Sequence, residues 1–300
     1  MQGAYRKRRH GWSSRFRLEA TQGDGGREAR APCGLARCLL KARAASYNPA
    51  IRSTQSGTGV SASQFCMIKA IFFDFNGVII NDEPLQLEAY REVLAAEGVS
   101  LTDEDYYGAL GMDDATFVRS FFERSGKPLT EELMQALIER KTALQHKMIE
   151  DELPLFPGVV TFIKAAARRY QLGVVSMARR VEIDHVLVRA GLDKSFAVIV
   201  SSEMARACKP DPDCYRRGLE LLNEKRREER QLPLLPRECL VVEDAPPGIA
   251  AGRAAGMRTL GITNTVSEEA LRAAGADVVT ASLADWIDDA VHHVFDTDWH

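Results

Sequence analysis

Short, uninterrupted runs of apolar residues recur along the chain from residue 70 onward, and each run ends at a polar residue. Because apolar and polar positions do not alternate within them, these runs are typical of strands that are buried on both faces of a sheet. The runs are Ala70–Asp74, Leu172–Ser176, Ala197–Ser201, Cys239–Glu243 and Thr259–Thr263, with Asp277–Thr280 as a sixth candidate.

Segments with helical periodicity separate most of these strands. They are Phe162–Tyr170, Ile183–Ala190, Asp213–Asn223, Ile249–Ala255 and Glu268–Ala274. The alternation predicts an α/β protein with a doubly wound, Rossmann-like parallel sheet. Ligands bind at the carboxyl ends of the strands in such sheets, so we expect Asp74, Ser176 and the pair Glu243–Asp244 to lie at one edge. Loops are polar in general, however, and the pattern alone does not distinguish a site from ordinary loops.

The stretch between residues 83 and 157 differs from the rest because it contains no strand pattern. Its amphipathic segments predict four helices, at Leu85–Glu97, Asp103–Leu110, Asp114–Ser125 and Glu131–Glu150. Thr102 and Thr130 are each followed by acidic residues, which is a common signal for the start of a helix. We therefore predict a small all-α cap over residues 83–157, inserted after the first strand of a core that comprises residues 67–82 and 158–300.

The amino-acid composition limits the classes of protein to which this chain can belong. The chain has 300 residues, of which 45% are hydrophobic and 27% are charged, a balance typical of soluble globular proteins. It has no apolar stretch of about 18 residues, so we expect no membrane span. Its six cysteines match no zinc-binding spacing, which favours reduced thiols and a cytoplasmic location.

The first 66 residues form a separate basic segment. They carry twelve Lys or Arg and three acidic residues without apolar periodicity, which predicts a disordered extension. Three interpretations remain open: a start that in the cell lies at Met67, an organelle transit peptide, or a basic arm for nucleic acid. We favour the first, because Met67 directly precedes the first predicted strand. Residues 67–300 carry twelve more acidic than basic residues, which argues against nucleic-acid binding by the core.

Four motifs place reactive side chains at predicted strand ends or in loops: Phe73–Ile79, Val174–Arg179, Cys208–Pro212 and Val242–Ile249. Three of them are weak signals alone. An aspartate before Asn-Gly often makes a turn, a serine after a strand often caps a helix, and a lysine before proline is usually a surface residue. The adjacent acids Glu243 and Asp244 are more informative, because hard cations such as Mg²⁺ take carboxylate oxygens as ligands.

Taken together and in this order, the motifs resemble those of the haloacid dehalogenase superfamily. The resemblance extends from about Met67 to Ala290 and is to the β-phosphoglucomutase-like phosphatases with a helical cap. It implies a Mg²⁺-dependent hydrolase of a small phosphorylated metabolite. Asp74 would be the nucleophile and would carry an aspartyl-phosphate intermediate. Ser176 would bind the transferring phosphoryl group, and Lys209 would balance its charge.

The resemblance also implies a metal site and a substrate pocket. The predicted Mg²⁺ ligands are Asp74, the backbone carbonyl of Asn76, Glu243 and Asp244. The predicted substrate contacts are Gly77, Met177 and Asp113. Asp113 belongs to a cap turn that offers acids where relatives have a basic residue, so we expect sugar bisphosphates to be disfavoured; an ordinary helix N-cap is the alternative for this residue. Both a monomer and a homodimer remain open.

One position departs from the family pattern. Phosphatases and mutases of this family have an aspartate two residues after the nucleophile, where it protonates the leaving group, whereas this chain has Asn76. An amide cannot exchange that proton, and general acid–base catalysis is worth roughly 10²–10⁴-fold. Three outcomes stay open. The substrate has a good leaving group, such as an acyl phosphate or anhydride; another residue, for example in the cap, supplies the proton; or the chain is a weak or inactive relative that binds a phosphorylated metabolite.

Two other reactions of the superfamily fit the sequence less well. Dehalogenation of a 2-haloacid proceeds without the second aspartate, but it also needs no Mg²⁺ and would leave Glu243 and Asp244 without a role. Phosphonate hydrolysis would require a Schiff-base lysine in the cap, and nothing in the sequence around Lys127 or Lys141 supports that role.

Overall fold

The computed structural model describes residues 67–286 and 288–295, so the predictions made for residues 1–66 lie outside the described part of the chain. Six strands form one sheet: β1 (Ala70–Phe73), β2 (Gln171–Val175), β3 (Val198–Val200), β4 (Cys239–Glu243), β5 (Arg258–Ile262) and β6 (Val278–Thr280). Their order is β3-β2-β1-β4-β5-β6, and every neighbouring pair is parallel. The predicted α/β class is confirmed.

Strand β1 lies at the centre of this sheet. Phe73, its last residue, is level with Val174 of β2 and with Val242 of β4. The three strands therefore end at the same edge, and the residues that follow them are brought together there. This register positions the candidate site.

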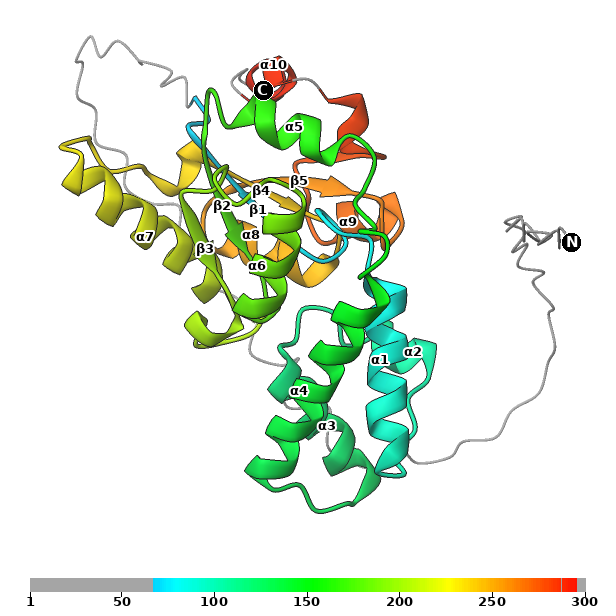
Figure 1. Ribbon diagram of the computed structural model, residues 1–300. Helices are drawn as coiled ribbons and strands as arrows, with labels where there is room; N and C mark the ends of the chain where they lie inside the picture. Colours follow the sequence, from blue (N-terminus) through cyan, green and yellow to red (C-terminus); the bar gives the residue numbers. More distant parts are fainter. Residues whose placement is uncertain (1–66, 287, 296–300) are drawn as a thin grey trace, which may run out of the picture. The chain divides into compact units, whose positions relative to one another are not determined.

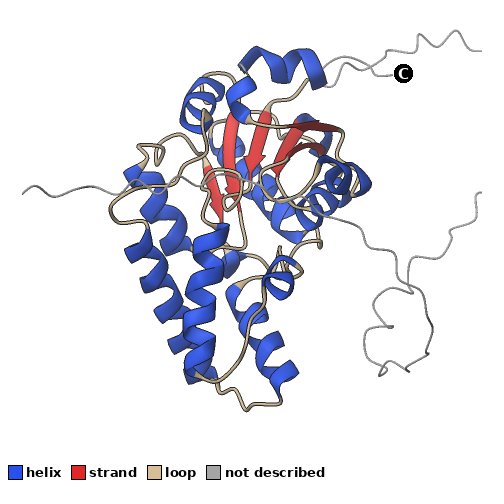
Figure 2. Cartoon of the chain, turned by 90° about the vertical axis from the view of Figure 1, so that its right-hand side faces the viewer, coloured by secondary structure: helices blue, strands red, loops and turns tan. Residues whose placement is uncertain are grey.

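Helices cover both faces of the sheet (Figures 1 and 2). They are α5 (Val159–Ala166), α6 (Arg180–Arg189), α7 (Asp213–Glu228), α8 (Pro246–Ala254), α9 (Glu268–Ala273) and α10 (Asp288–Phe295). Successive side chains of a strand point to opposite faces. Accordingly, Phe73 packs in the apolar layer that contains side chains of α5, α6 and α10, whereas Phe72 packs in the layer that contains those of α7 and α8. Short 3₁₀ turns occur at Ser202–Met204, Pro236–Glu238 and Leu283–Asp285.

An all-helical segment follows β1, as predicted, and Figure 2 shows helices alone there. It comprises α1 (Glu83–Ala96), α2 (Asp103–Tyr107), α3 (Asp114–Ser125) and α4 (Glu131–Met148). The side chains of Thr102 and Thr130 accept hydrogen bonds from backbone N–H groups at the starts of α2 and α4. Leu94, Phe122 and Leu137 belong to an apolar core of its own. We call this segment the cap; the boundaries 83 and 157 stay a prediction.

The chain leaves and re-joins the sheet region through two adjacent segments. The N–H of Asn81 donates to the carbonyl of Pro154 at 2.7 Å, and the N–H of Phe156 donates to the carbonyl of Ile79 at 3.3 Å. Helix α7 ends at Glu228, so the charged stretch that follows residue 223 begins as the end of this helix, and α10 was not predicted. None of the helices in the described residues is long and apolar enough to cross a membrane.

Candidate active site

Asp74 directly follows β1 and is held against the neighbouring strand, because its N–H donates to the carbonyl of Val242 at 3.0 Å. Its carboxylate lies 3.0 Å from the ammonium of Lys209. Lys209 precedes α7 and is only 5% exposed. Its ammonium also donates to Glu243 Oε1 at 2.6 Å and to the carbonyl of Val175 at 3.3 Å. The structure thus brings together residues that follow or end three different strands.

The charge on Lys209 is maintained by these carboxylates. Burial lowers the pKa of Lys209, but the negative charges of Asp74 and Glu243 outweigh that effect, and the net pKa is raised above its usual value. The side chain therefore stays a cation throughout the neutral pH range. A fixed cation beside a nucleophilic carboxylate is suited to stabilising negative charge that develops on a reacting group.

Glu243 is fully buried at the end of β4. Its Oε1 accepts hydrogen bonds from Lys209 and, at 2.5 Å, from the hydroxyl of Tyr215. Its Oε2 has no hydrogen-bond partner among the described residues. Burial and the charge of Asp74 raise the pKa of Glu243. A Cβ atom at Gly248 would lie 1.9 Å from Cδ of Glu243, so this carboxylate fits only against a glycine.

Asp244 completes an acidic cluster. One oxygen from each of Asp74, Glu243 and Asp244 lies within 4.8 Å of the others. Burial, followed by the charges of Glu243 and Asp74, raises the pKa of Asp244 well above its usual value. Three carboxyl groups stand beside one ammonium, and Glu243 Oε2 has no hydrogen-bond partner among the described residues. This oxygen-rich cluster, with more acidic groups than cations, fits a divalent cation.

The turn after Asp74 approaches this cluster closely. Gly77 has a positive φ of 72°, and a Cβ atom there would lie 1.8 Å from Asp244 Oδ2. Glycine is thus required both by its backbone conformation and by the space that Asp244 occupies. The carbonyl of Gly77 accepts a hydrogen bond from Asn264 Nδ2 at 2.7 Å, which fixes the turn. Gly77 is not among the residues that line the cavity described next.

A cavity of about 90 Å³ lies between the sheet edge and the cap. Its core side is lined by Asp74, Asn76, Ser176, Met177 and Lys209, which the sequence had indicated. Ser176 is buried, and its Oγ accepts a hydrogen bond from the N–H of Ala178 at 3.1 Å, which leaves the hydroxyl proton available as a donor. Asp113 does not line the cavity. It caps α3 by accepting from the N–H of Thr116 at 2.7 Å, and its neighbour Asp114 lines the cavity instead.

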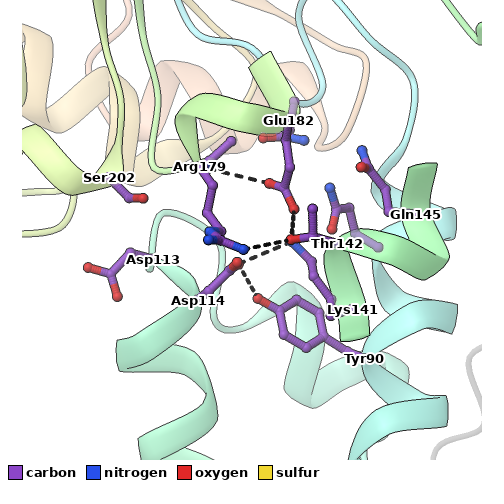
Figure 3. A network of polar contacts seen from close by, with 12 residues as sticks. Tyr90, Asp113, Asp114, Lys141, Thr142, Gln145, Arg179, Glu182 and Ser202 are labelled. Atoms are coloured by element: carbon purple, nitrogen blue, oxygen red, sulfur yellow. Dashed lines mark hydrogen bonds and ion pairs between the residues drawn. The ribbon is translucent and has the colours of Figure 1, made fainter. Parts of the chain in front are cut away.

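A buried polar network joins the cap to the core at this cavity (Figure 3). Lys141 of α4 donates to Asp114 of α3 at 3.1 Å and to Glu182 of α6 at 3.0 Å. The hydroxyl of Tyr90 donates to Asp114 at 2.5 Å, and that of Thr142 donates to Glu182 at 2.8 Å. Because Glu182 belongs to the core and the other four residues to the cap, this network fixes the cap against α6.

The cap side of the cavity contains residues that the sequence analysis did not select. Glu83, Gln86 and Tyr90 line it from α1, and their spacing of three and four residues places them on one helical face. That spacing of polar groups directly after the nucleophile motif was the signal that could have identified them. Glu83 accepts a hydrogen bond from the hydroxyl of Tyr106 at 2.5 Å. Burial and the charge of Asp82 raise the pKa of Glu83 to about 7.

The class of this protein follows from three features: a Rossmann-like parallel sheet, a helical cap, and a carboxylate–lysine site at the strand ends. Residues 68–256 match the family described as haloacid dehalogenase-like hydrolase, and the chain belongs to this family.

Two curated relatives and one solved structure illustrate the similarity. The chain is 30% identical over 224 residues to a phosphorylated carbohydrates phosphatase of Thermotoga maritima, covering 70% of this chain and 92% of that protein. It is 28% identical over 227 residues to protein SUPPRESSOR OF QUENCHING 1, chloroplastic, of Arabidopsis thaliana, covering 73% of this chain but only 20% of that protein. A β-phosphoglucomutase from Clostridium difficile shares the fold, with a TM-score of 0.66, 21% identity, and coverage of 77% and 98% of the two chains.

Proposed function

We propose that this chain is a Mg²⁺-dependent phosphatase that removes phosphate from a small phosphorylated metabolite through an aspartyl-phosphate on Asp74. The observation that supports it most is the position of Asp74, 3.0 Å from the ammonium of Lys209 and within the cluster formed with Glu243 and Asp244, at the wall of a cavity. A carboxylate so placed can attack phosphorus while fixed charges stabilise the transferring group.

The reaction has two steps. In the first, a carboxylate oxygen of Asp74 bonds to phosphorus and the bond from phosphorus to the leaving oxygen breaks. In the second, a water oxygen bonds to phosphorus, the bond to Asp74 breaks, and inorganic phosphate is released. Lys209 and the hydroxyl proton of Ser176 stabilise the phosphoryl oxygens in both steps.

The cation would be held by Asp74, Glu243, Asp244 and the backbone carbonyl of Asn76. When bound, Mg²⁺ supplies positive charge to the phosphoryl oxygens. Within this set, Glu243 has only Oε2 to offer, because its Oε1 already accepts hydrogen bonds from Lys209 and Tyr215. Tyr215 and Lys209 thus hold Glu243 in a fixed orientation, which is the role expected of groups that support a metal ligand.

The cap residues favour a substrate with one phosphate and several hydroxyl groups. Glu83, Gln86 and Tyr90 offer carboxylate, amide and hydroxyl groups to the cavity. Lys141, the cation on this side, is already paired with two carboxylates, so a second phosphate would meet no free positive charge there. The Thermotoga maritima relative is named for phosphorylated carbohydrates, which carry hydroxyl groups of this kind.

The proposed location is the cytoplasm, and an organelle is the alternative, since one relative is described as chloroplastic. Gly77, Met177 and Asp113 remain proposed as substrate contacts. For Met177 the support is its place at the cavity wall, whereas Asp113 and Gly77 would reach a substrate only after a rearrangement. The oligomeric state is proposed as monomer or homodimer.

A phosphatase panel with the full chain tests the proposal. The substrates are hexitol, hexose and triose monophosphates together with acetyl phosphate, each with Mg²⁺ and with EDTA, and Asp74→Asn is the inactive control. We expect Mg²⁺-dependent phosphate release from at least one substrate and acid-stable phosphate on the chain at Asp74 after rapid quenching. Release without Mg²⁺, or from Asp74→Asn at the same rate, would contradict it. Chloride release from a 2-haloacid without Mg²⁺ would favour dehalogenation instead.

A second candidate function is favoured by Asn76, which offers no proton at the usual position of the acid. The chain would then bind a phosphorylated metabolite with little or no turnover. Substrate-dependent thermal stabilisation without phosphate release in the same panel would support it over the phosphatase.

A further inference from the structure

Asp82 is a fully buried carboxylate next to the candidate site. It precedes α1, yet its side chain makes no capping hydrogen bond to that helix. Instead, three side-chain amides donate to it. Nδ2 of Asn76 lies 3.0 Å from each carboxylate oxygen, and Nε2 of Gln86 and of Gln145 lie 3.0 and 2.9 Å from Oδ2. We call Asn76, Gln86 and Gln145 the amide cage of Asp82.

This arrangement determines which end of the Asn76 amide faces the cavity. Because the NH₂ group of Asn76 is directed at Asp82, its Oδ1 is at the opposite corner of the planar amide. Asn76 also lines the cavity next to Asp74. All three amides of the cage turn their NH₂ groups toward Asp82, so its carboxylate accepts a hydrogen bond from each of them. The corner of the Asn76 amide that is not bound to Asp82 therefore carries the acceptor Oδ1.

The carboxyl group that an acid–base aspartate would place at position 76 thus stands one contact further out, at position 82. A buried carboxylate is costly unless it is fully hydrogen-bonded, and the three amides meet that need. A second carboxylate at position 76 would stand about 3 Å from Asp82 and repel it. An amide at position 76 avoids this repulsion and donates to Asp82 instead.

We propose that Asp82 is a positioning residue that holds Asn76 as a pure acceptor at the reacting phosphorus, and that the site consequently acts on acyl phosphates or phosphoanhydrides in preference to alkyl phosphate esters. This inference rests on the proposed phosphatase function. An acyl phosphate loses a carboxylate anion, which needs no proton when its bond to phosphorus breaks. An alkyl ester loses an alkoxide, which does.

The second step is also balanced without an acid at position 76. The attacking water can donate a hydrogen bond to Asn76 Oδ1, which orients its oxygen toward phosphorus. As the new bond to phosphorus forms and the bond to Asp74 breaks, the proton that the water donates to Asn76 stays on the water oxygen, and the water's other proton passes to a phosphoryl oxygen. The products are the Asp74 carboxylate and dihydrogen phosphate. The amide orients the water but takes up no proton.

Exchanging the two groups tests this role. In the double variant Asn76→Asp/Asp82→Asn, the new amide at position 82 can donate to the new carboxylate at 76 and still accept from Gln86 and Gln145, so three of the four hydrogen bonds are kept. The single variant Asn76→Asp places two carboxylates face to face. The single variant Asp82→Asn either places two NH₂ groups face to face or makes the amide of Asn76 turn round. The full chain and these three variants are compared on acetyl phosphate and ethyl phosphate, which differ little in size, with Asn81→Asp as an exposed, isosteric charge control.

We expect the unmodified chain to turn over acetyl phosphate and to be far slower on ethyl phosphate. The double variant should raise kcat on ethyl phosphate by about 10²–10⁴-fold, the usual contribution of a general acid, whereas Asn76→Asp alone should give less than about a tenth of that gain. Asp82→Asn should lower kcat on acetyl phosphate by about tenfold or more, and Asn81→Asp should leave the ratio of the two rates unchanged.

Several outcomes would overturn the inference. One is an equal gain of kcat on ethyl phosphate in Asn76→Asp and in the double variant. Another is an unchanged kcat on acetyl phosphate in Asp82→Asn. Equal rates of the unmodified chain on the two substrates would also overturn it while leaving the phosphatase function intact. If a single variant does not fold, the comparison of the unmodified chain with the double variant still decides, because an unchanged rate ratio contradicts the role of Asp82. Absence of phosphate release from every substrate would instead refute the proposed function.

Discussion

Replacing Lys141 by methionine should destabilise the protein strongly at alkaline pH and less at acidic pH. The ammonium of Lys141 lies 3.1 Å from Asp114 and 3.0 Å from Glu182, and its side chain is 3% exposed. At this separation and an effective dielectric constant of about 20, each pair attracts by roughly 5 kcal/mol, and desolvation offsets much of that gain. Methionine fills the space but leaves two buried carboxylates unpaired, for which we expect a loss of about 3–5 kcal/mol.

The pH dependence of this loss follows from the carboxylates. Burial already raises the pKa of Glu182 despite the nearby Lys141, and removal of the cation raises it further. The folded variant then binds a proton more tightly than the unfolded chain does, so its stability increases as the pH falls toward the ordinary pKa of a glutamate. The loss at about pH 5.5 should therefore be smaller than the loss at about pH 8.

Urea denaturation followed by far-ultraviolet circular dichroism at both pH values measures these differences. Lys147→Met, at an exposed position on the same helix, is the matched control and should change the free energy of unfolding by less than about 0.5 kcal/mol. A loss below about 1 kcal/mol for Lys141→Met, or the same loss at both pH values, would refute the reasoning that this network holds the cap to the core.

Two further predictions concern the candidate site. Glu83 has a pKa of about 7 in the folded protein against an ordinary value of 4.5, so its favourable contribution is present at low pH and is lost as the pH rises through 7. Glu83→Gln should therefore be more stable than the unmodified chain by about 3 kcal/mol above pH 7 in EDTA, and no more stable near pH 4. Urea denaturation measures this, and an equal difference in the free energy of unfolding at both pH values would contradict it. Gly248→Ala would place a Cβ atom 1.9 Å from Glu243, so we expect a loss above about 1–3 kcal/mol. Gly252→Ala on the same helix meets its nearest atoms at 3.1 Å and should lose less in thermal unfolding; the reverse order would show that Glu243 can move aside.

The parts of the structure that could be predicted from the sequence are those set by local pattern. The strand Cys239–Glu243 has the bounds that its apolar run indicates, and α3 spans the predicted residues 114–125. Asp74 and the pair Glu243–Asp244 come together because parallel strands end at one edge of the sheet, which the strand–helix alternation already implies.

The parts that could not be predicted depend on contacts between distant residues. Asp82 and Gln145 are 63 positions apart, and the local sequence around neither residue reveals that their side chains meet. The sequence around Lys141 indicates no role for this residue, whereas in the structure its ammonium lies between two carboxylates, one of which belongs to α6. At the start of α3, a shift of one position along the chain decides which aspartate lines the cavity. Asp113 caps the helix, and Asp114 lines the cavity.

The central place of β1 in the sheet has a consequence for the order in which a nascent chain can fold. Ala70 pairs with Gln171 and with Cys239, so β1 leaves the ribosome about 100 residues before its first partner strand and about 170 before its second. At roughly 5–20 residues per second, that is a wait of about 5–20 s for the first partner alone. The helices of the cap are complete within this interval and can bury their own apolar core. The strand that precedes the nucleophile meanwhile has no partner strand, so its apolar residues stay unpaired until β2 has been made.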